Sequence, residues 1–239
     1  MKRVLVSGGS RGIGAEIVRE FAASGDKVAF LYHQAEKAAQ NLERETGAAA
    51  VCADVGDPDA VRRAVREATE KLGGAPEIVV ASAGVSSVML SRDTSDAEWR
   101  RVTDTDLSGV FYLARECQGE MIRAGWGRMI FIGSMWGKVG ASMEAAYSAA
   151  KAGVRGLTMA LAKELGPSGI TVNCVEPGVI DTEMNAFLGE AERAALVEAT
   201  PLCRIGTVFD VAAAVRFFAD EKAGFITGQM LGVDGGFAV

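Results

Sequence analysis

Short apolar runs alternate with longer amphipathic segments along the whole chain. The apolar runs lie at residues 3–7, 27–32, 49–53, 77–81, 128–133, 170–175 and 229–233. Several of them, such as 129–132, are apolar at every position, which is typical of strands buried on both faces of a parallel sheet. The segments between them have helical patterns, at 12–24, 35–46, 58–72, 97–123, 145–165 and 208–220. The alternation predicts an α/β fold, a doubly wound, seven-stranded parallel sheet with helices on both faces.

The composition is that of an ordinary globular chain. Of 239 residues, 49% are hydrophobic and 23% charged, and no linker or repeat interrupts the chain, so we expect residues 1–239 to form a single domain. The 31 acidic and 25 basic residues give a net charge of −6, which disfavours nucleic acid and anionic membranes as partners. The first apolar run is too short for a signal peptide, and no run is long enough to span a membrane. We therefore expect a cytoplasmic protein.

The cysteines and the single histidine do not predict a metal site. Cys52, Cys117, Cys174 and Cys203 are scattered, and His33 has no second histidine to pair with. No spacing among them matches that of known metal ligands. We expect the four cysteines to be buried free thiols in a reducing compartment.

A glycine-rich turn follows the first predicted strand. Residues 7–14 read SGGSRGIG, and a helical pattern begins within them. Glycines at this place allow backbone N–H groups to approach a pyrophosphate closely, and the helix N-terminus favours the negative charge. The spacing differs from the G-x-G-x-x-G fingerprint, and the Gly-Lys-Ser/Thr of a triphosphate-binding loop is absent. The turn therefore predicts a nucleotide site and disfavours an ATPase.

Tyr147 and Lys151 are four residues apart in a predicted helix, so they share one face. A neighbouring ammonium favours the phenolate form, and we expect it to lower the pKa of the tyrosine toward the range useful for proton transfer. Ser134 directly follows the strand 128–133, at the sheet edge where ligands bind in such folds. A hydroxyl there can hydrogen-bond a substrate carbonyl.

With these residues the chain resembles the short-chain dehydrogenase/reductase family from end to end. Further matching motifs lie at residues 54–55, 177–182, 226–228 and 233–236. The resemblance implies a Rossmann-like fold and a nicotinamide cofactor. It also implies that Tyr147 gives a proton to a carbonyl oxygen, that Ser134 orients the carbonyl and that Lys151 binds the nicotinamide ribose. The cofactor contacts that it implies are Ser7, Gly8, Ser10, Arg11, Gly12, Ile13, Gly14, Tyr32, His33, Asp54, Val55, Ala83, Gly84, Tyr147, Lys151, Pro177, Gly178, Ile180 and Thr182.

Two departures from the family pattern affect the site. The family's Asn-Asn-Ala-Gly segment reads Ala-Ser-Ala-Gly at residues 81–84, so an amide side chain that braces the site is lost. The asparagine that forms the fourth member of the family's catalytic set is replaced by Asp106. An aspartate can keep the geometry of that position, or its charge can hold Lys151 protonated and disturb a proton relay.

Cofactor and substrate follow from the same resemblance. The second strand ends in Tyr32 and His33 and lacks the acid that selects NAD, while Arg11 can meet a 2′-phosphate, so we expect NADPH. The family resemblance favours a 3-oxoacyl-acyl-carrier-protein reductase acting on a small ketone or an oxoacyl thioester. Residues 134–137 and 140–144 also resemble reductases of the 5-aminopentanone modification on elongation factor P, a modified protein. An alternative of another class is a nucleotide-sensing protein without catalysis.

The expected substrate pocket contains Trp136 and Glu144. Glu144 precedes the helix of Tyr147 and can either pair with a substrate ammonium beside the aromatic face of Trp136 or complement the helix dipole. Arginines that dock the carrier in similar reductases are replaced by Gly125 and Ser168, although Arg123 and Arg128 are nearby.

We also expect a homotetramer, as in similar proteins. Helices 97–123 and 145–165 and the segment 225–239 are the predicted contacts between subunits. Candidate contact residues are Ala149, Ala152, Val154, Leu157 and Leu161.

Overall fold

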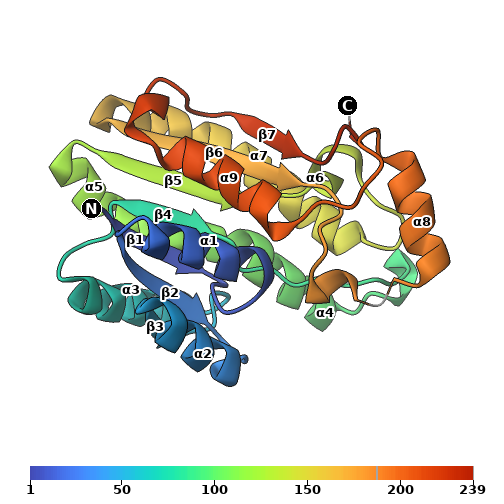
Figure 1. The fold of residues 1–239 in the computed structure, drawn as a ribbon, viewed down its shortest axis with the longest axis horizontal. Helices are drawn as coiled ribbons and strands as arrows, with labels where there is room; N and C mark the ends of the chain where they lie inside the picture. Colours follow the sequence, from blue (N-terminus) through green and yellow to red (C-terminus); the bar gives the residue numbers. More distant parts are fainter. Residues whose placement is uncertain (187, 239) are drawn as a thin grey trace.

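A computed structural model describes residues 1–186 and 188–238 of the chain (Figure 1). Seven strands form one sheet in the order β3-β2-β1-β4-β5-β6-β7, and every neighbouring pair is parallel. The strands are β1 (Arg3–Ser7), β2 (Lys27–Tyr32), β3 (Ala49–Cys52), β4 (Ile78–Ala81), β5 (Gly127–Ile132), β6 (Ile170–Pro177) and β7 (Met230–Val233). The predicted doubly wound sheet is confirmed, and each strand begins and ends within two residues of its predicted bounds.

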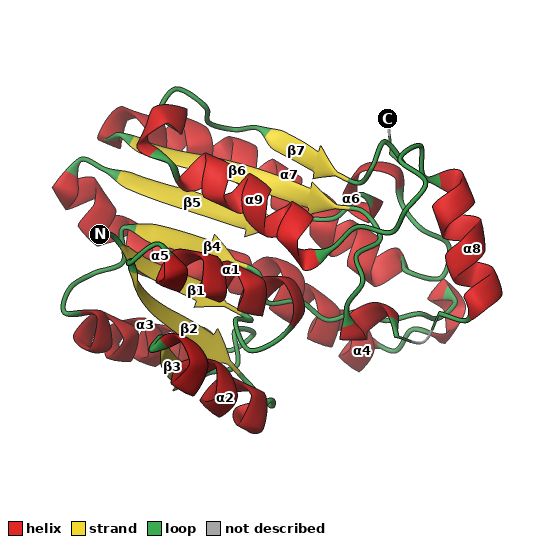
Figure 2. Ribbon diagram, in the orientation of Figure 1, coloured by secondary structure: helices red, strands yellow, loops and turns green. Residues whose placement is uncertain are grey.

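Helices cover both faces of the sheet (Figure 2). The longer helices are α1 (Gly12–Ala23), α2 (Glu36–Thr46), α3 (Pro58–Leu72), α5 (Gly109–Ala124), α7 (Ala145–Leu165) and α9 (Val208–Ala219). One hydrophobic core lies between the sheet and α3, α5 and α7, and a second between the sheet and α1, α2 and α9. Successive residues of a strand enter opposite cores, as Val4 and Leu5 of β1 do. This explains why continuous apolar runs mark the strands in the sequence.

The direction of winding changes between β1 and β4, which lie side by side in the sheet. From β1 the chain winds outward to β2 and β3, and it then crosses to β4 and winds the other way. In open sheets of this kind the connections diverge at such a point and leave a crevice beyond the carboxyl ends of the strands. The glycine turn after β1 and the segment after β4 both lie at this edge.

The single helix predicted at 97–123 is wrong in its middle. The chain forms α4 (Asp96–Thr103), then a π-helical turn (Asp104–Ser108), and then α5. No proline at 104–108 marks this interruption of the helix in the sequence. Contacts with distant residues accompany the wider turn instead. Asp106 lies in this turn with no exposed surface and accepts a hydrogen bond from the Val85 N–H at 2.9 Å.

Two helices were not predicted: α6 (Trp136–Val139) and α8 (Glu190–Ala199). The first is a single turn after β5. The second buries none of its residues, so it lacks the apolar stripe by which an amphipathic helix is recognised. Both lie beyond the carboxyl end of the sheet, near the C-terminal segment (Figure 1).

Two expectations about burial are corrected. Cys117 and Cys174 are buried free thiols, but Cys52 and Cys203 are exposed because they lie at the end of an edge strand and in a surface loop. Among the candidate subunit contacts, Val154 and Leu161 belong to the core of the chain itself, since the face of α7 that carries them packs on the sheet. Ala149 and Ala152 are exposed, and Leu157 is half-buried against that core.

Among the residues that the structure describes, no helix is long and apolar enough to cross a bilayer.

Candidate active site

A cavity of about 660 Å³ opens at the carboxyl edge of the sheet. It extends from the glycine turn, past the ends of β4 and β5, to the start of α7. The predicted site residues that line it are Gly8, Ser10, Arg11, Gly12, Ile13, Gly14, Tyr32, His33, Asp54, Val55, Ala83, Gly84, Ser134, Trp136, Glu144, Tyr147, Lys151, Pro177, Gly178, Ile180 and Thr182. Ser7 and Asp106 lie behind this lining and are buried.

The glycine turn leaves no room for side chains on the inner side of the cavity. Gly8 has φ 66°, and a Cβ atom there would lie 2.6 Å from the Ala83 Cα. A Cβ atom on Gly14 would lie 2.2 Å from the Gly8 carbonyl oxygen. The bare backbone and the N-terminus of α1 therefore border the cavity together, an arrangement that fits a pyrophosphate.

Ser7 supports the segment after β4 from behind. Its hydroxyl oxygen accepts hydrogen bonds from the N–H groups of Ser82 at 3.1 Å and Ala83 at 3.2 Å. On the far side of this segment, the Asp106 carboxylate accepts the Val85 N–H. These bonds fix the backbone of the segment whose bracing amide is missing from the sequence.

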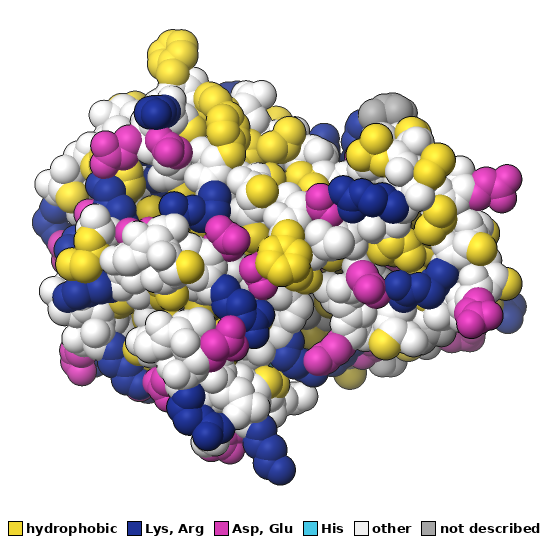
Figure 3. Space-filling view, viewed as in Figure 1, with side chains coloured by type: hydrophobic (Ala, Val, Ile, Leu, Met, Phe, Trp, Pro, Cys, Tyr) yellow, Lys and Arg dark blue, Asp and Glu magenta, His cyan; other side chains and the backbone are white. Residues whose placement is uncertain are grey.

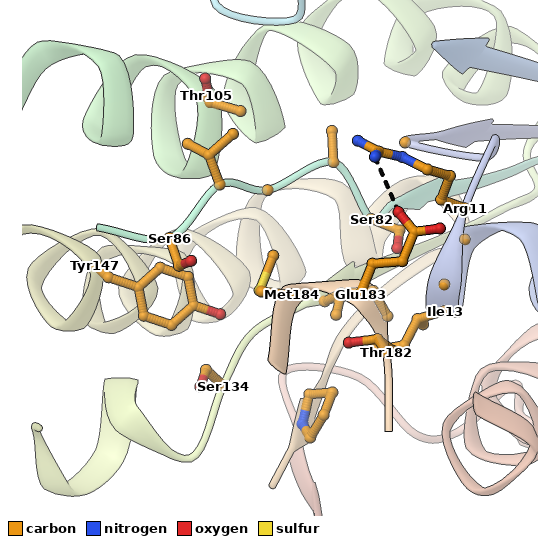
Figure 4. A pocket seen from close by; sticks show the side chains of 18 of the residues that line it. Arg11, Ile13, Ser82, Ser86, Thr105, Ser134, Tyr147, Thr182, Glu183 and Met184 are labelled. Atoms are coloured by element: carbon orange, nitrogen blue, oxygen red, sulfur yellow. Dashed lines mark hydrogen bonds and ion pairs between the residues drawn. The ribbon is translucent and has the colours of Figure 1, made fainter. Parts of the chain in front are cut away.

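Tyr147, Ser134 and Lys151 converge at the end of the cavity opposite the glycine turn. In Figure 4 the hydroxyl of Tyr147 points into the cavity, and Ser134 lies at the same end. Tyr147 is 9% exposed, Ser134 6% and Lys151 3%. The Ser134 oxygen accepts the Trp136 N–H at 3.2 Å, so its own hydroxyl hydrogen can be donated to Tyr147 or to a ligand. The Lys151 Nζ lies 5.5 Å from the centre of the Tyr147 ring.

Asp106 forms a buried ion pair with Lys151. The Asp106 Oδ1 lies 3.1 Å from the Lys151 Nζ, which also donates to the Ile132 carbonyl at 3.1 Å. Burial is the largest influence on the pKa of Lys151 and lowers it, but the charge of Asp106, the charge of Tyr147 and the hydrogen bond to Asp106 together raise it by more, so the pKa lies above its ordinary value. Burial raises the pKa of Asp106, against the pull of Lys151. Lys151 is therefore an ammonium at neutral pH. This agrees with the alternative from the sequence in which the charge of Asp106 holds Lys151 protonated.

The expected lowering of the Tyr147 pKa is wrong for this site. Burial raises the pKa of Tyr147, and Lys151 and Ser134 lower it by less. The charge of Asp106 also raises it, because a negative charge nearby disfavours the phenolate. The tyrosine is thus a protonated phenol at neutral pH, which is the form able to donate a proton.

At the nucleotide end, Arg11 is paired within the chain. Its Nη1 donates to the Glu183 Oε2 at 3.0 Å, and both side chains are largely exposed (Figure 4). Surface ion pairs of this kind are worth about 0–1 kcal/mol, so a phosphate can compete for the guanidinium. His33 and Asp54 also line this end, with 4.0 Å between the His33 Nδ1 and the Asp54 Oδ2.

Some lining residues had no signal in the sequence. They come from loops and helical turns that the fold brings over the cavity and include Val85, Ser86, Val88, Arg101, Thr105, Glu183, Met184 and Asn185. Charge complementarity between Arg11 and an acid could have indicated Glu183, but the two are far apart in the sequence.

The chain is similar to known proteins along nearly its whole length. A family model described as enoyl-(acyl carrier protein) reductase matches residues 8–238. The 3-oxoacyl-[acyl-carrier-protein] reductase MabA of Mycobacterium tuberculosis is 39% identical over 238 residues, which cover 100% of this chain and 93% of that protein. The 3-oxoacyl-[acyl-carrier-protein] reductase FabG of Pseudomonas aeruginosa is 39% identical over 239 residues, covering 98% of this chain and 96% of that protein.

Among solved structures, a similar fold occurs in a blue fluorescent protein from a metagenomic library, determined in complex with NADPH. The two structures superpose with a TM-score of 0.93 at 38% sequence identity, and the match covers 100% of this chain and 98% of that one.

Proposed function

Because the chain belongs to the short-chain dehydrogenase/reductase family, we propose that this oxidoreductase reduces ketones with NADPH and that Tyr147 donates the proton. The observation that carries the proposal is one cavity with the glycine cradle at one end and Ser134, Tyr147 and Lys151 at the other. A dinucleotide bound along this cavity reaches from the cradle to the hydroxyl groups. When bound, it supplies the hydride.

Cofactor binding, carbonyl orientation and proton transfer are assigned to different groups of the chain. The backbone of the glycine turn and the N-terminus of α1 bind the pyrophosphate. Ser134 donates its hydroxyl hydrogen to the carbonyl oxygen, and Tyr147 passes its proton to the same oxygen as charge develops there. Lys151, held charged by Asp106, orients the ribose and stabilises the phenolate that remains.

Two observations support NADPH as the cofactor. Arg11 lies beside the adenine-ribose end of the cavity, and neither Tyr32 nor His33 at the end of β2 offers a carboxylate to a ribose hydroxyl. The structurally similar blue fluorescent protein was solved with NADPH.

For the substrate, the names of MabA and FabG support a 3-oxoacyl thioester. The two arginines that remained as candidates for binding an acidic carrier do not fit that role. Arg128 is only 3% exposed, with its guanidinium over the Trp126 ring, and Arg123 pairs with Glu120. We therefore propose a small thioester, such as acetoacetyl coenzyme A, ahead of a carrier-bound one.

Catalysis is favoured over nucleotide sensing because Ser134, Tyr147 and Lys151 are all present and converge on one cavity. We further propose that residues 1–239 act as a single domain.

Replacing Tyr147 with phenylalanine tests the proposal. The change removes the proton donor and keeps the ring, so turnover of acetoacetyl coenzyme A should fall by about 10² to 10⁴. The assay follows NADPH oxidation, and NADPH binding is measured separately by fluorescence. If the variant keeps more than about a tenth of wild-type turnover, the proton comes from another group.

A further inference from the structure

The C-terminal segment, residues 234–238, meets the wall of the cavity through a pair of aromatic rings. It passes beside α6 in Figure 1, and the ring centroids of Trp136 and Phe237 lie 5.7 Å apart with their planes at 88°. Aromatic pairs prefer such an edge-to-face arrangement. Trp136 lines the end of the cavity that holds Ser134 and Tyr147. Phe237 is half-buried and lies outside both hydrophobic cores, so its contact with Trp136 is not part of the packing that holds the sheet and its helices together.

On its other side, Trp136 packs against α7. Its side chain contacts a small apolar cluster that includes Tyr147. The turn of α6 also lies close on α7, since a Cβ atom on Gly137 would be 2.7 Å from the carbonyl carbon of Lys151. Trp136 therefore lies between Phe237 and the helix that carries Tyr147 and Lys151.

The turn of α6 is too short to fix the Trp136 side chain by itself. It has four residues, and helical turns of this length are unstable without tertiary contacts. At its start, the Trp136 N–H donates to the Ser134 Oγ at 3.2 Å, which holds the backbone but not the ring. On the side of the C-terminal segment, the Lys138 Nζ donates to the Ala238 carbonyl. Phe237 and Ala238 thus support α6 at two points.

The C-terminal segment is itself folded into a turn that Asp234 closes. The Asp234 Oδ1 accepts the Gly236 N–H at 3.0 Å, and the Oδ2 accepts the Ala238 N–H at 3.1 Å. Gly235 and Gly236 have φ 65° and 87°, which glycine adopts without steric cost. The turn therefore presents the Phe237 ring from an ordered backbone.

We propose that Phe237 is a positioning residue for substrate binding, because it holds the Trp136 indole in place as a wall of the substrate end. The inference rests on the proposed ketone reduction, which places the substrate beside Ser134 and Tyr147. Without the Phe237 ring the indole can turn, and the wall loses its shape. Most of the groups proposed to bind NADPH lie toward the glycine turn, so the effect of losing the ring falls on the KM of the ketone.

Phe237→Leu tests this role, because it removes the ring and keeps an apolar side chain. We expect the KM for acetoacetyl coenzyme A to rise by about two- to tenfold, the range that an aromatic pair is worth. The kcat and the KM for NADPH should change by less than about twofold. Phe237→Tyr keeps the ring and should restore the KM. Phe209→Leu is the matched control, since Phe209 is an exposed phenylalanine on α9, and it should leave both KM values unchanged.

A double-mutant cycle separates positioning from a general loss of structure. Trp136→Leu should raise the KM for the ketone, and adding Phe237→Leu to it should raise the KM no further if Phe237 acts through Trp136. Phe237→Met is made alongside, so that the comparison does not depend on the folding of one variant. Equal rises in both backgrounds, an unchanged KM in the single variants, or an equal rise in the KM for NADPH overturns the inference. A wild-type protein that does not reduce acetoacetyl coenzyme A would instead count against the proposed function.

Discussion

Asp106 changes the charge balance around the two groups proposed to transfer the proton. Its carboxylate neutralises Lys151 at 3.1 Å and raises the pKa of Tyr147. Lys151 favours the phenolate, Asp106 opposes part of that effect, and burial outweighs what remains, so the phenol is favoured. Reduction needs the phenol form of Tyr147. The raised pKa keeps Tyr147 protonated through neutral and moderately alkaline pH.

Asp106→Asn tests this balance. Asparagine keeps an oxygen for the Val85 N–H but removes the negative charge, so the pKa of Tyr147 should fall. Because reduction is lost as the pH rises through that pKa, its alkaline limit should move to lower pH. Profiles of kcat/KM against pH for both proteins measure the shift. An alkaline limit that stays in place or moves upward would mean that Asp106 does not act on Tyr147 through charge.

A second prediction concerns Arg11 and the preference for NADPH over NADH. A 2′-phosphate must compete with Glu183 for the guanidinium, at 3.0 Å in the structure. Glu183→Gln should therefore lower the KM for NADPH by about two- to fivefold, since an exposed ion pair is worth at most about 1 kcal/mol. Arg11→Ala should raise the KM for NADPH and leave that for NADH nearly unchanged. Comparable or better kcat/KM with NADH in the wild type would contradict the NADPH assignment.

The sequence indicated most of the site's residues because they belong to local motifs. The glycine turn and the spacing of Tyr147 and Lys151 are visible within a few positions of one another. Glu183 and Arg101 were not visible, because each reaches the cavity from a loop or helix that only tertiary packing brings there. The raised pKa of Tyr147 was missed for the same reason, since burial and the charge of Asp106 depend on the folded chain.

At the scale of elements, the strands could be predicted because burial on both faces leaves continuous apolar runs. The turn that separates α4 from α5 could not, because no local pattern marks a π-helical turn and the contacts of its Asp106, with Lys151 and Val85, are made across the fold. Likewise α8 has no buried residue, and its short apolar side chains are mostly alanines, so its sequence carries only a weak periodic signal. Elements that lie around the cavity, outside the two cores, are the ones that local patterns describe least well.

The contact between α1 and the glycine turn gives a prediction for these elements. Gly14→Ala places a Cβ atom 2.2 Å from the Gly8 carbonyl oxygen, so the helix and the turn must separate. We expect the free energy of unfolding to fall by about 1–3 kcal/mol and NADPH binding to weaken at least tenfold. Denaturant titration and fluorescence measure the two effects.

Gly119→Ala is the control for that change. Gly119 lies inside α5, and a Cβ atom there meets nothing within 4 Å. Alanine should therefore stabilise the protein by about 0.5–1 kcal/mol through its helix propensity. A Gly14→Ala protein as stable as wild type, with unchanged NADPH affinity, would show that the close contact is not needed.

At the scale of the whole molecule, two separate apolar surfaces are exposed. The first lies around the edge strand β7, where hydrophobic side chains gather in Figure 3, and includes Phe225, Leu231 and, on α9, Phe217. The second is on the outer side of α5 and α7 and includes Phe111, Ile122 and Met159. Exposed apolar patches of this kind are typical of contacts between subunits.

Two distinct surfaces that each pair with a copy of themselves produce a tetramer with three two-fold axes. We therefore expect light scattering at micromolar concentration to give four times the chain mass of 25.0 kDa. Phe225→Asp should reduce the particle to a dimer, because the side chain is fully exposed and a carboxylate there opposes its own copy across the axis. Met159→Asp should do the same through the other surface, and the double variant should be monomeric. A monomeric wild-type protein would contradict the proposed role of both surfaces. A dimeric wild type that Phe225→Asp leaves dimeric would contradict the role of the β7 surface only.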